Sequence, residues 1–365
     1  MKTQAAVLHQ PETPLTIEEV DLGPVKAEDV LVRIVASGVC HSDLHVYHGQ
    51  KGWPMPMVLG HEGAGIVEEV GSAVTQVSPG DHVVINLAPY CGRCRHCSTG
   101  RVYRCLNRRG PAGCLYDGDT RLASGGQRIH HFANSATYAR HAIIHESSAI
   151  RVDDDVPLEK ACLVGCALPT GIGAVINTAR VEPGSTVVVI GCGGVGLNVV
   201  QGARLAGAAR IIAVDVLEHK LAIAREFGAT DIIDASMEST VEQVQRMTGG
   251  EGADYAFEVI GTVETIMDAY DCIGRGGKAV VVGVGPDGVH LPIDPRSLLQ
   301  EKTLTGTQYG STRAARDFPL YLDLYRQGRI KIDELITGYR KLEEINEAFQ
   351  DLEEGRAIRT VLLME

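Results

Sequence analysis

The stretch "STVVVIGCGGVGLNVVQGARLAG", residues 185–207, combines an apolar run, a group of glycines and a second apolar segment. The Val- and Ile-rich run before the glycines is typical of a strand buried on both faces, and the apolar spacing after them is that of a helix. A further apolar run, "RIIAVD" at 210–215, follows the expected helix. The stretch is therefore predicted to be the first strand–helix–strand unit of a parallel sheet.

The glycines match the pattern G-x-G-x-x-G at Gly191, Gly193 and Gly196. Such a pattern alone is a weak indication, but this one follows an expected strand and opens an expected helix. The first glycine would permit a tight turn, the second would let the backbone approach a pyrophosphate, and the third would allow close helix–strand packing. With the free N–H groups of the helix start, the loop predicts a dinucleotide site.

The end of the second strand indicates which dinucleotide would bind. Asp215 stands where a carboxylate would accept hydrogen bonds from both hydroxyls of the adenosine ribose and repel a 2′-phosphate. Val216 and Leu217, which follow it, offer no cation for such a phosphate. NAD is therefore expected rather than NADP. Lys220 could reach the same ribose, or it could be an ordinary solvated helix lysine.

The sequence outside this stretch predicts two domains. Helical and apolar segments alternate onward to "GGKAVVVGVG" at 276–285, which favours a doubly wound α/β sheet. The residues before about 150 read instead as short strands broken by Gly and Pro. We expect a nucleotide-binding domain of Rossmann type at 169–308, inserted in a β-rich catalytic domain made of 1–168 and 309–365.

Composition narrows the class of protein. The chain has 365 residues and a formal net charge of -12, which argues against binding to nucleic acid. No apolar run approaches the roughly 18–20 residues of a membrane helix, and the start lacks a signal-peptide pattern. The expectations are no nucleic acid partner, no membrane partner and a cytoplasmic location. The ten cysteines then read as ligands or thiols rather than disulfides.

Four cysteines fall within the segment "CGRCRHCSTGRVYRC" with the spacing C-x2-C-x2-C-x7-C. Four thiolates on one short loop favour a closed, structural zinc site. An iron–sulfur cluster is the alternative, but its fourth cysteine usually follows after three residues and precedes proline. The predicted structural zinc ligands are Cys91, Cys94, Cys97 and Cys105.

A second group of metal-ligand types lies near the N-terminus. "GVCHSDLH" at 38–45 is followed by "GHEGAG" at 60–65, and "LVGCALPTGIG" occurs at 163–173. A lone cysteine is more often a buried core residue, and a lone histidine is more often an ordinary hydrogen-bonded one. Three ligands with an open fourth position, however, would make a catalytic zinc site.

Taken together, these motifs resemble those of the zinc-dependent medium-chain alcohol dehydrogenases over essentially the whole chain. The resemblance rests on the cysteine lobe, on the paired C-x-S-x-x-H and G-H-E, on "GCALPTGIGA", on "GCGGVG" with its aspartate, on "FEVIG" and on "IRT". It implies a Rossmann domain inserted in a GroES-like catalytic domain. It also implies two zinc ions per chain, NAD as cofactor, and a homodimer. The strand-like segment "GVHLPID" at 288–294 could extend the sheet across the two-fold axis of that dimer.

The resemblance also implies roles for the residues around the second metal. Cys40, His61 and Cys166 would bind the catalytic zinc, with Glu62 beside it and Asp43 orienting the histidine.

The implied reaction is NAD-linked, reversible oxidation of primary alcohols to aldehydes, by hydride transfer from a zinc-bound alkoxide. Ser42 would take the alcohol's proton and pass it, through the nicotinamide ribose, to His45 and solvent.

Further positions are implied for the cofactor. Thr170 and Val195 would pack against the nicotinamide, while Gly194 belongs to the glycine loop. Arg359 and His41 would contact the pyrophosphate, the histidine more weakly than an arginine.

The substrate is less well determined. Leu87, where relatives often have an aromatic residue, suggests room for a bulky or aromatic alcohol, and Trp53 could border the same cleft or serve only in packing. Arg109 aligns with an arginine that holds glutathione in class III members, or it is a surface arginine. A thiol-adduct formaldehyde dehydrogenase and a nicotinoprotein with trapped NAD are therefore alternatives. A zinc-stabilised, non-enzymatic regulator is a further one.

Overall fold

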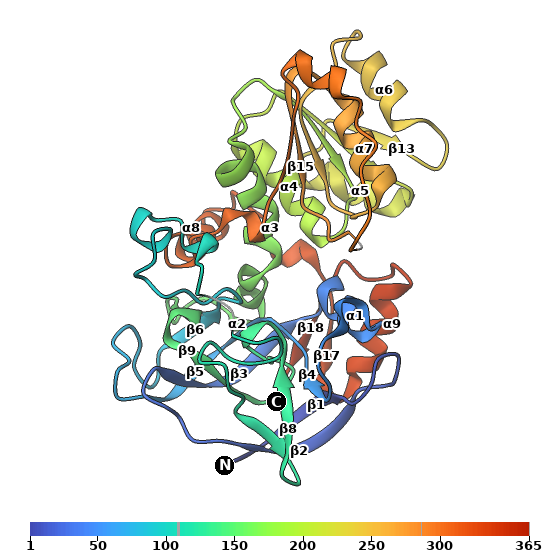
Figure 1. Cartoon of the computed structure of the whole chain (residues 1–365). Helices are drawn as coiled ribbons and strands as arrows, with labels where there is room; N and C mark the ends of the chain where they lie inside the picture. The colour runs from blue at the N-terminus through green and yellow to red at the C-terminus, as the bar shows by residue number, and fades with distance from the viewer. Residues whose placement is uncertain (108–109, 286, 365) are drawn as a thin grey trace. The chain divides into compact units, whose positions relative to one another are not determined.

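The structure, a computed structural model, describes residues 1–107, 110–285 and 287–364. The chain divides into two compact units, which are described separately (Figure 1). The boundaries expected from the sequence, after 168 and before 309, lie a few residues from this division. Unit 1 comprises Met1–Cys166, Arg313–Gly328 and Ile332–Glu365, and unit 2 comprises Ala167–Thr312 and Arg329–Lys331.

Unit 2 is built on a sheet of six strands among the described residues, and every neighbouring pair is parallel. The central strand β11 (Thr186–Ile190) comes from the apolar run of the glycine-rich stretch, and it is buried as expected for a strand covered on both faces. In spatial order the strands are β13 (Asp231–Asp234), β12 (Arg210–Asp215), β11, β14 (Ala253–Glu258), β15 (Ile273–Val281) and β16 (Thr303–Gly306).

Helices cover both faces of this sheet. Val188 of β11 belongs to one core cluster with Val244 and Tyr270, which lie on α6 (Thr240–Met247) and α7 (Val263–Cys272). The next residue, Val189, points the other way, since a Cβ on Gly196 of α4 (Gly194–Leu205) would lie 3.9 Å from its side chain. A further helix, α5 (Glu218–Phe227), follows β12. The doubly wound α/β fold predicted from the sequence is confirmed.

The strand order reverses between β11 and β14, because the chain runs outward from β11 in one direction and from β14 in the other. In open parallel sheets, ligands bind beyond the carboxyl ends of the strands at such a switch point. The glycine loop begins at Gly191, directly after β11. The fold therefore brings the predicted dinucleotide loop to the position where this class of sheet binds nucleotides.

The outer edge of β16 is where a second copy of the chain could pair in the expected homodimer. The segment "GVHLPID" at 288–294, predicted to be strand-like, forms no strand in the described part of the chain, and η8 (Pro295–Gln300) follows it. Leu298 and Leu299 of η8 are exposed. No strand among the described residues pairs with the free edge of β16. The homodimer stays a prediction.

Two further segments complete unit 2. The helix α3 (Ala167–Gly173) continues into η7 (Ala174–Ala179), and η9 (Tyr309–Ser311) packs beside both. A side chain at Gly173 would overlap the backbone of Gly310, so close packing of α3 on η9 requires glycine there.

Unit 1 consists of a closed barrel and a seven-stranded sheet, which is the GroES-like part of the predicted fold. Buried side chains from consecutive residues of β1 and β3 share one core cluster with Leu352 and Leu362, so both ends of the chain pack together. The barrel strands are β1 (Lys2–Leu8), β2 (Thr16–Leu22), β7 (Leu122–Ser124), β8 (Gln127–His131) and β4 (Met57–Val58). The sheet strands are β10 (Ala149–Arg151), β6 (His82–Ile85), β5 (Glu62–Val70), β3 (Asp29–Gly38), β18 (Arg359–Leu363) and β17 (Ile336–Lys341), with β9 (His141–His145) on β3.

Short helices connect these strands. The ones that position the site are α1 (His41–Tyr47), α2 (Leu158–Ala161), η6 (Cys162–Gly165) and η4 (Phe132–Asn134). The others are η1 (Gln50–Gly52), η2 (Cys97–Thr99), η3 (Val102–Arg104), η5 (Glu146–Ser148), α8 (Ala314–Arg326), η10 (Asp333–Leu335), η11 (Leu342–Glu344) and α9 (Ile345–Glu353).

Within the described residues, no single helix has both the length and the apolar composition needed to cross a membrane. One bent pair, Leu158–Gly165 with Ala167–Ala179, meets that test of length and composition only when its two helices are taken together.

A buried histidine at the end of β8 predicts a pH dependence of stability. His131 is 1% exposed, and its Nε2 accepts a hydrogen bond from the backbone N–H of Arg121 at 3.1 Å. Burial, reinforced by the nearby Arg121 charge, lowers the pKa of His131 to about 3. The unfolded chain would take up a proton below pH 6.5 that the folded chain does not. The contribution of neutral, buried His131 to the free energy of unfolding is thus complete above pH 6.5 and is lost as the pH falls toward 3.

We expect the His131→Gln variant, whose amide oxygen can still accept from Arg121, to lack this loss. Between pH 7.5 and 5, the free energy of unfolding of the wild type should fall by about 2 kcal/mol more than that of the variant. Chemical denaturation at both pH values measures the difference, and parallel pH profiles would contradict the assignment.

Candidate active site

The residues predicted for the catalytic metal come from three segments of unit 1. Cys40 directly precedes α1, and its backbone N–H donates to the Asp43 carboxylate at 3.3 Å, while the N–H of Asp43 donates back to the carbonyl of Cys40 at 3.0 Å. This pairing fixes the helix start, as in a capping box. His61 and Glu62 lie where β5 begins, and Cys166 follows η6.

The pairing of β3 with β5 brings the first two of these segments together. Gly38, at the end of β3, is opposite Glu62, and a side chain at Gly38 would overlap the Glu62 carboxylate. Glycine is therefore required at 38 for the carboxylate to lie over the end of β3.

Donor atoms of Cys40, His61, Glu62 and Cys166 all lie within 4.8 Å of one another, and all four side chains are buried. Two sulfurs, an imidazole and a carboxylate form a donor set suited to zinc. The structure thus brings the three predicted ligands together and adds Glu62 at ligand distance. The orientation of the imidazole also fits, because its Nδ1 lies 3.3 Å from Asp43 and Nε2 is left for the metal.

The same donors perturb one another's protonation. A hydrogen bond from Cys166 and the positive charge of Arg359 hold the pKa of Cys40 well below its usual value, against the effect of burial. The pKa of Cys166 is raised by the same hydrogen bond and by burial. Burial raises the pKa of Glu62 to about 7. A buried group of this composition favours a bound cation, which would stabilise its ionised forms.

A cationic side chain, Arg359, also lies against these donors. It is 1% exposed, and its guanidinium lies 3.7 Å from Glu62 Oε1 and 3.9 Å from Cys40 Sγ. The contact with Glu62 was not predicted from the sequence, since nearly the whole chain separates the two residues. Contact of Arg359 with the cofactor pyrophosphate stays a prediction.

An aromatic wall borders His61. The ring of Phe132 packs edge-on against the imidazole, with ring centroids 5.4 Å apart, and Trp53 packs edge-on against Phe132 at 5.3 Å. Trp53 was a candidate from the sequence, but Phe132 was missed. The only available signal was that it follows "HH" in a chain with just five phenylalanines.

The predicted proton-transfer residues lie on α1. Ser42 and His45 are separated by one helical turn, and both are half-buried, whereas His41 is exposed. Residues three apart on a helix share a face. The helix therefore carries both groups along one side, starting next to Cys40. Their roles, and that of His41 toward phosphate, stay predictions.

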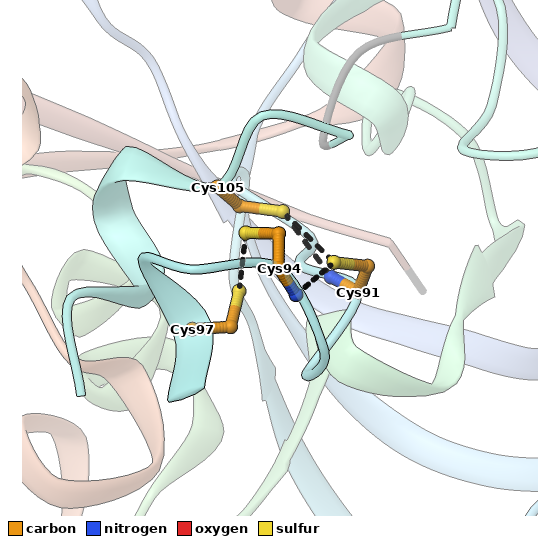
Figure 2. Close-up of side chains that lie close together, drawn as sticks. All are labelled: Cys91, Cys94, Cys97 and Cys105. Carbon is orange, nitrogen blue, oxygen red and sulfur yellow. Dashed lines mark hydrogen bonds between the residues drawn. The ribbon is translucent and has the colours of Figure 1, made fainter. Parts of the chain in front are cut away.

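The four-cysteine lobe forms a second donor group (Figure 2). The sulfur atoms of Cys91, Cys94, Cys97 and Cys105 all lie within 4.8 Å of one another. Backbone N–H groups donate to two of them, from Cys94 to Cys91 Sγ at 3.4 Å and from Cys91 to Cys105 Sγ at 3.3 Å. Such bonds stabilise thiolates, and four sulfurs fit a closed zinc site without an open position. Arg109, suggested for glutathione, lies outside the described residues.

The glycine loop of unit 2 has the geometry that its three roles require. Gly191 has φ +98°, a conformation that favours glycine. A Cβ on Gly193 would meet nothing within 4 Å, which leaves open space beside the backbone for a ligand. A Cβ on Gly196 would overlap the carbonyl oxygen of Gly191, so α4 packs against the turn as predicted. These residues fit a dinucleotide pyrophosphate at the start of α4.

Asp215 also has a structural role that the sequence did not indicate. Its carboxylate accepts hydrogen bonds from the backbone N–H groups of Cys192 at 2.8 Å, Val216 at 2.8 Å and Leu217 at 3.1 Å. It therefore ties the glycine loop to the end of β12, and the ribose contact would use its remaining lone pairs. Lys220 is half-buried on α5.

The remaining predicted cofactor residues also belong to unit 2. Gly194 and Val195 open α4, and Thr170 lies on α3. Val195 and Thr170 are half-buried. Their contacts with a nicotinamide stay predictions.

Comparison with known proteins adds a further finding. Residues 26–154 match the family model described as the alcohol dehydrogenase GroES-like domain, and residues 194–327 match that of the zinc-binding dehydrogenases. An alcohol dehydrogenase zinc-binding domain protein from Burkholderia ambifaria is 36% identical, with 100% of this chain and 99% of that chain covered and a TM-score of 0.95. Benzyl alcohol dehydrogenase from Acinetobacter calcoaceticus is 33% identical, with both chains covered in full and a TM-score of 0.95. A putative zinc-binding dehydrogenase from Sinorhizobium meliloti, whose structure holds NADP, is 27% identical, with both chains fully covered and a TM-score of 0.83.

The two donor groups should respond differently to the loss of one ligand. Cys40→Ser should abolish turnover and remove one zinc while the protein stays folded. Cys91→Ser should lower the melting temperature by roughly 5 °C or more, because metal binding at a closed site contributes directly to folding free energy.

Metal analysis and thermal denaturation of both variants test this expectation. A wild-type protein that contains one zinc ion, or iron, would contradict it.

Proposed function

This chain belongs to the zinc-dependent medium-chain alcohol dehydrogenase family, and we propose that it catalyses the reversible, NAD-linked oxidation of primary alcohols, aromatic ones among them, to aldehydes. The family uses zinc and NAD(P). The observation that carries the proposal is the buried group formed by Cys40, His61, Glu62 and Cys166.

Cys40, His61 and Cys166 would hold the catalytic zinc, and the four-cysteine lobe would hold the structural one. Bound there, zinc supplies a Lewis acid that lowers the pKa of the alcohol, and NAD supplies the hydride acceptor. Asp43 keeps the ring of His61 turned so that Nε2 is available. In this proposal unit 1 is the catalytic domain and unit 2 the NAD-binding domain.

Oxidation of an alcohol to an aldehyde releases one hydride and one proton. The hydride reduces NAD, and the proton must reach solvent. We assign its removal to Ser42, whose hydroxyl lies two residues from Cys40 at the start of α1, and its release to His45, one turn further along the same side of the helix. The pKa of an imidazole suits it to exchange protons with water near neutral pH.

The aromatic wall supports an aromatic substrate. Phe132, which is buried, and Trp53, which is half-buried, extend from the side of His61 and would give an apolar, aromatic border to a substrate bound there. Leu87 is half-buried and smaller than an aromatic side chain. The similarity to a benzyl alcohol dehydrogenase points in the same direction.

The preference for NAD over NADP rests on Asp215. Its carboxylate lies at the end of β12 beside the glycine loop, and the exposed residue after it, Val216, is uncharged. A 2′-phosphate placed there would meet a negative charge, which costs several kcal/mol. Among the relatives one structure holds NADP, so the choice depends on residues of this kind and does not follow from the family alone.

The proposal is tested by assaying purified protein with benzyl alcohol and comparing added NAD with added NADP. We expect turnover with NAD without glutathione, and a specificity constant roughly a hundredfold or more lower with NADP. Turnover only when glutathione and formaldehyde are present would identify a thiol-adduct enzyme instead. Turnover linked to an added electron acceptor without free NAD would identify trapped cofactor. No reaction with any alcohol or aldehyde would refute the proposal.

The proton path gives a separate prediction. Ser42→Ala should lower kcat more than a hundredfold, as expected for loss of a positioned acid–base group. Ser42→Thr, which keeps the hydroxyl, should remain active. His45→Gln should cost roughly tenfold, mostly below pH 7 where hydroxide is scarce, and imidazole should restore part of the rate. Zinc content should be unchanged in all three variants. Loss of a zinc ion from His45→Gln would show instead that His45 is a ligand.

A further inference from the structure

A fully buried tyrosine lies behind the candidate catalytic metal group. Tyr138, between η4 and β9, is 0% exposed. Its hydroxyl donates a hydrogen bond to Asp43 Oδ2 at 2.9 Å, and the carbonyl of Gly38 is a more distant neighbour at 3.4 Å. A buried phenol needs a polar partner for its hydroxyl, and here that partner is the carboxylate that orients His61.

The Asp43 carboxylate is itself 0% exposed and accepts four hydrogen bonds. On Oδ1 the donors are the backbone N–H of Gly60 at 2.9 Å and His61 Nδ1 at 3.3 Å. On Oδ2 they are the backbone N–H of Cys40 at 3.3 Å and the Tyr138 hydroxyl at 2.9 Å. Tyr138 thus supplies the shorter bond to Oδ2, and it is the only side chain among the described residues for which a bond to that oxygen is found. Removal of this hydroxyl would leave Oδ2 with the longer bond from the Cys40 N–H.

The segment that carries Tyr138 also holds the chain just before His61. The N–H groups of Thr137 and Tyr138 donate to the carbonyls of Gly60 and Leu59, both at 3.0 Å. The Ser135 hydroxyl donates to Gly60 as well, at 3.2 Å. Residues 135–138 therefore form a clasp on Leu59 and Gly60.

The backbone at the start of the clasp is strained. Just before the clasp, Ala133 and Asn134 have positive φ, 50° and 58°, and within it Ala136 has φ 60°. Non-glycine residues persist in that region only where the surrounding contacts hold them, and such strain gathers at functional sites. At Gly60, a side chain would lie 2.5 Å from the ring of Tyr138, so the clasp requires glycine there.

We infer that Tyr138 is a positioning residue for the catalytic metal: its hydroxyl fixes Asp43, and Asp43 fixes the ring of His61 with Nε2 toward the ion. The inference rests on the proposed zinc site at Cys40, His61 and Cys166. Partners that orient a metal-binding histidine typically change metal affinity 10–100-fold when they are removed. Tyr138 acts one hydrogen bond further out, so an effect near the lower end of that range is expected.

The test is Tyr138→Phe, which removes one oxygen and keeps the ring that packs near Phe349. Fully loaded protein is mixed with a strong chelator, and zinc release is followed over time. The catalytic zinc should leave roughly tenfold faster than in the wild type, while release of the structural zinc is unchanged. Tyr270→Phe is the matched control, because Tyr270 is 1% exposed and its hydroxyl bonds Ser297 at 2.7 Å, far along the chain in unit 2.

A double-mutant cycle separates this role from general packing. If Tyr138 acts through Asp43, Tyr138→Phe should have little further effect on zinc release once Asp43→Asn is present. Additive effects would mean that the tyrosine acts by another route. The absorption spectrum of cobalt-substituted protein, which reports the ligand geometry, should also shift in Tyr138→Phe and not in Tyr270→Phe.

Failure of the role inferred for Tyr138 and failure of the proposed zinc site give different results. A wild type that binds two zinc ions, with equal release from Tyr138→Phe, would overturn the inference and leave the proposed function intact. Faster release from both sites would overturn it too, since it would indicate general loosening. A wild type that binds zinc only at the four-cysteine lobe would refute the catalytic site itself.

Discussion

The buried group of acidic donors in unit 1, whose ionised forms need a nearby positive charge, is the constraint on which much of this chain depends. Cys40, Glu62, Cys166 and Asp43 lie within one desolvated region, where unpaired charge is costly. The compensating groups are Arg359, the imidazole of His61 and, in the proposed function, zinc. Segments from both ends of the chain must therefore meet, and the pairing of β18 with β3 brings Arg359 to Cys40.

A different constraint, close backbone packing, governs unit 2. The turn after β11 admits α4 only because glycines stand at 191 and 196, and Asp215 then ties the turn to β12. The carboxylate thus serves two purposes: it holds the loop in shape and faces the ribose in the proposed complex. Substitution of Asp215 would disturb both the loop and the ribose contact, so a variant with altered cofactor preference should also have a less well held glycine loop.

Local patterns explain what could be predicted from the sequence. The glycine loop, the four cysteines and the apolar strands are each short, continuous segments, so the fold class and the four-cysteine group could be predicted from spacing. The ligands of the other donor group were predicted from the resemblance. The contacts of Glu62 with Arg359, of Phe132 with His61 and of Tyr138 with Asp43 join residues far apart in sequence. No periodicity marks such pairs. The strand-like segment 288–294 forms no strand within this chain, and its pairing across a dimer axis stays a prediction, because such pairing needs a second copy.

The two donor groups differ in what they require of the fold. All four cysteines of the lobe lie on residues 91–105, and Cys91 and Cys94 stay partly exposed, so a metal there can organise its own loop. The donors at Cys40, His61 and Cys166 are buried and come from separate segments, so the sheet must form before they can converge. Metal at the first group therefore stabilises local structure, whereas the second group depends on structure that already exists. An orienting shell around His61 is useful only in the second case, because there the geometry is set by the protein before the metal arrives. The clasp from Ser135 to Tyr138 lies behind that group, where such a shell is needed.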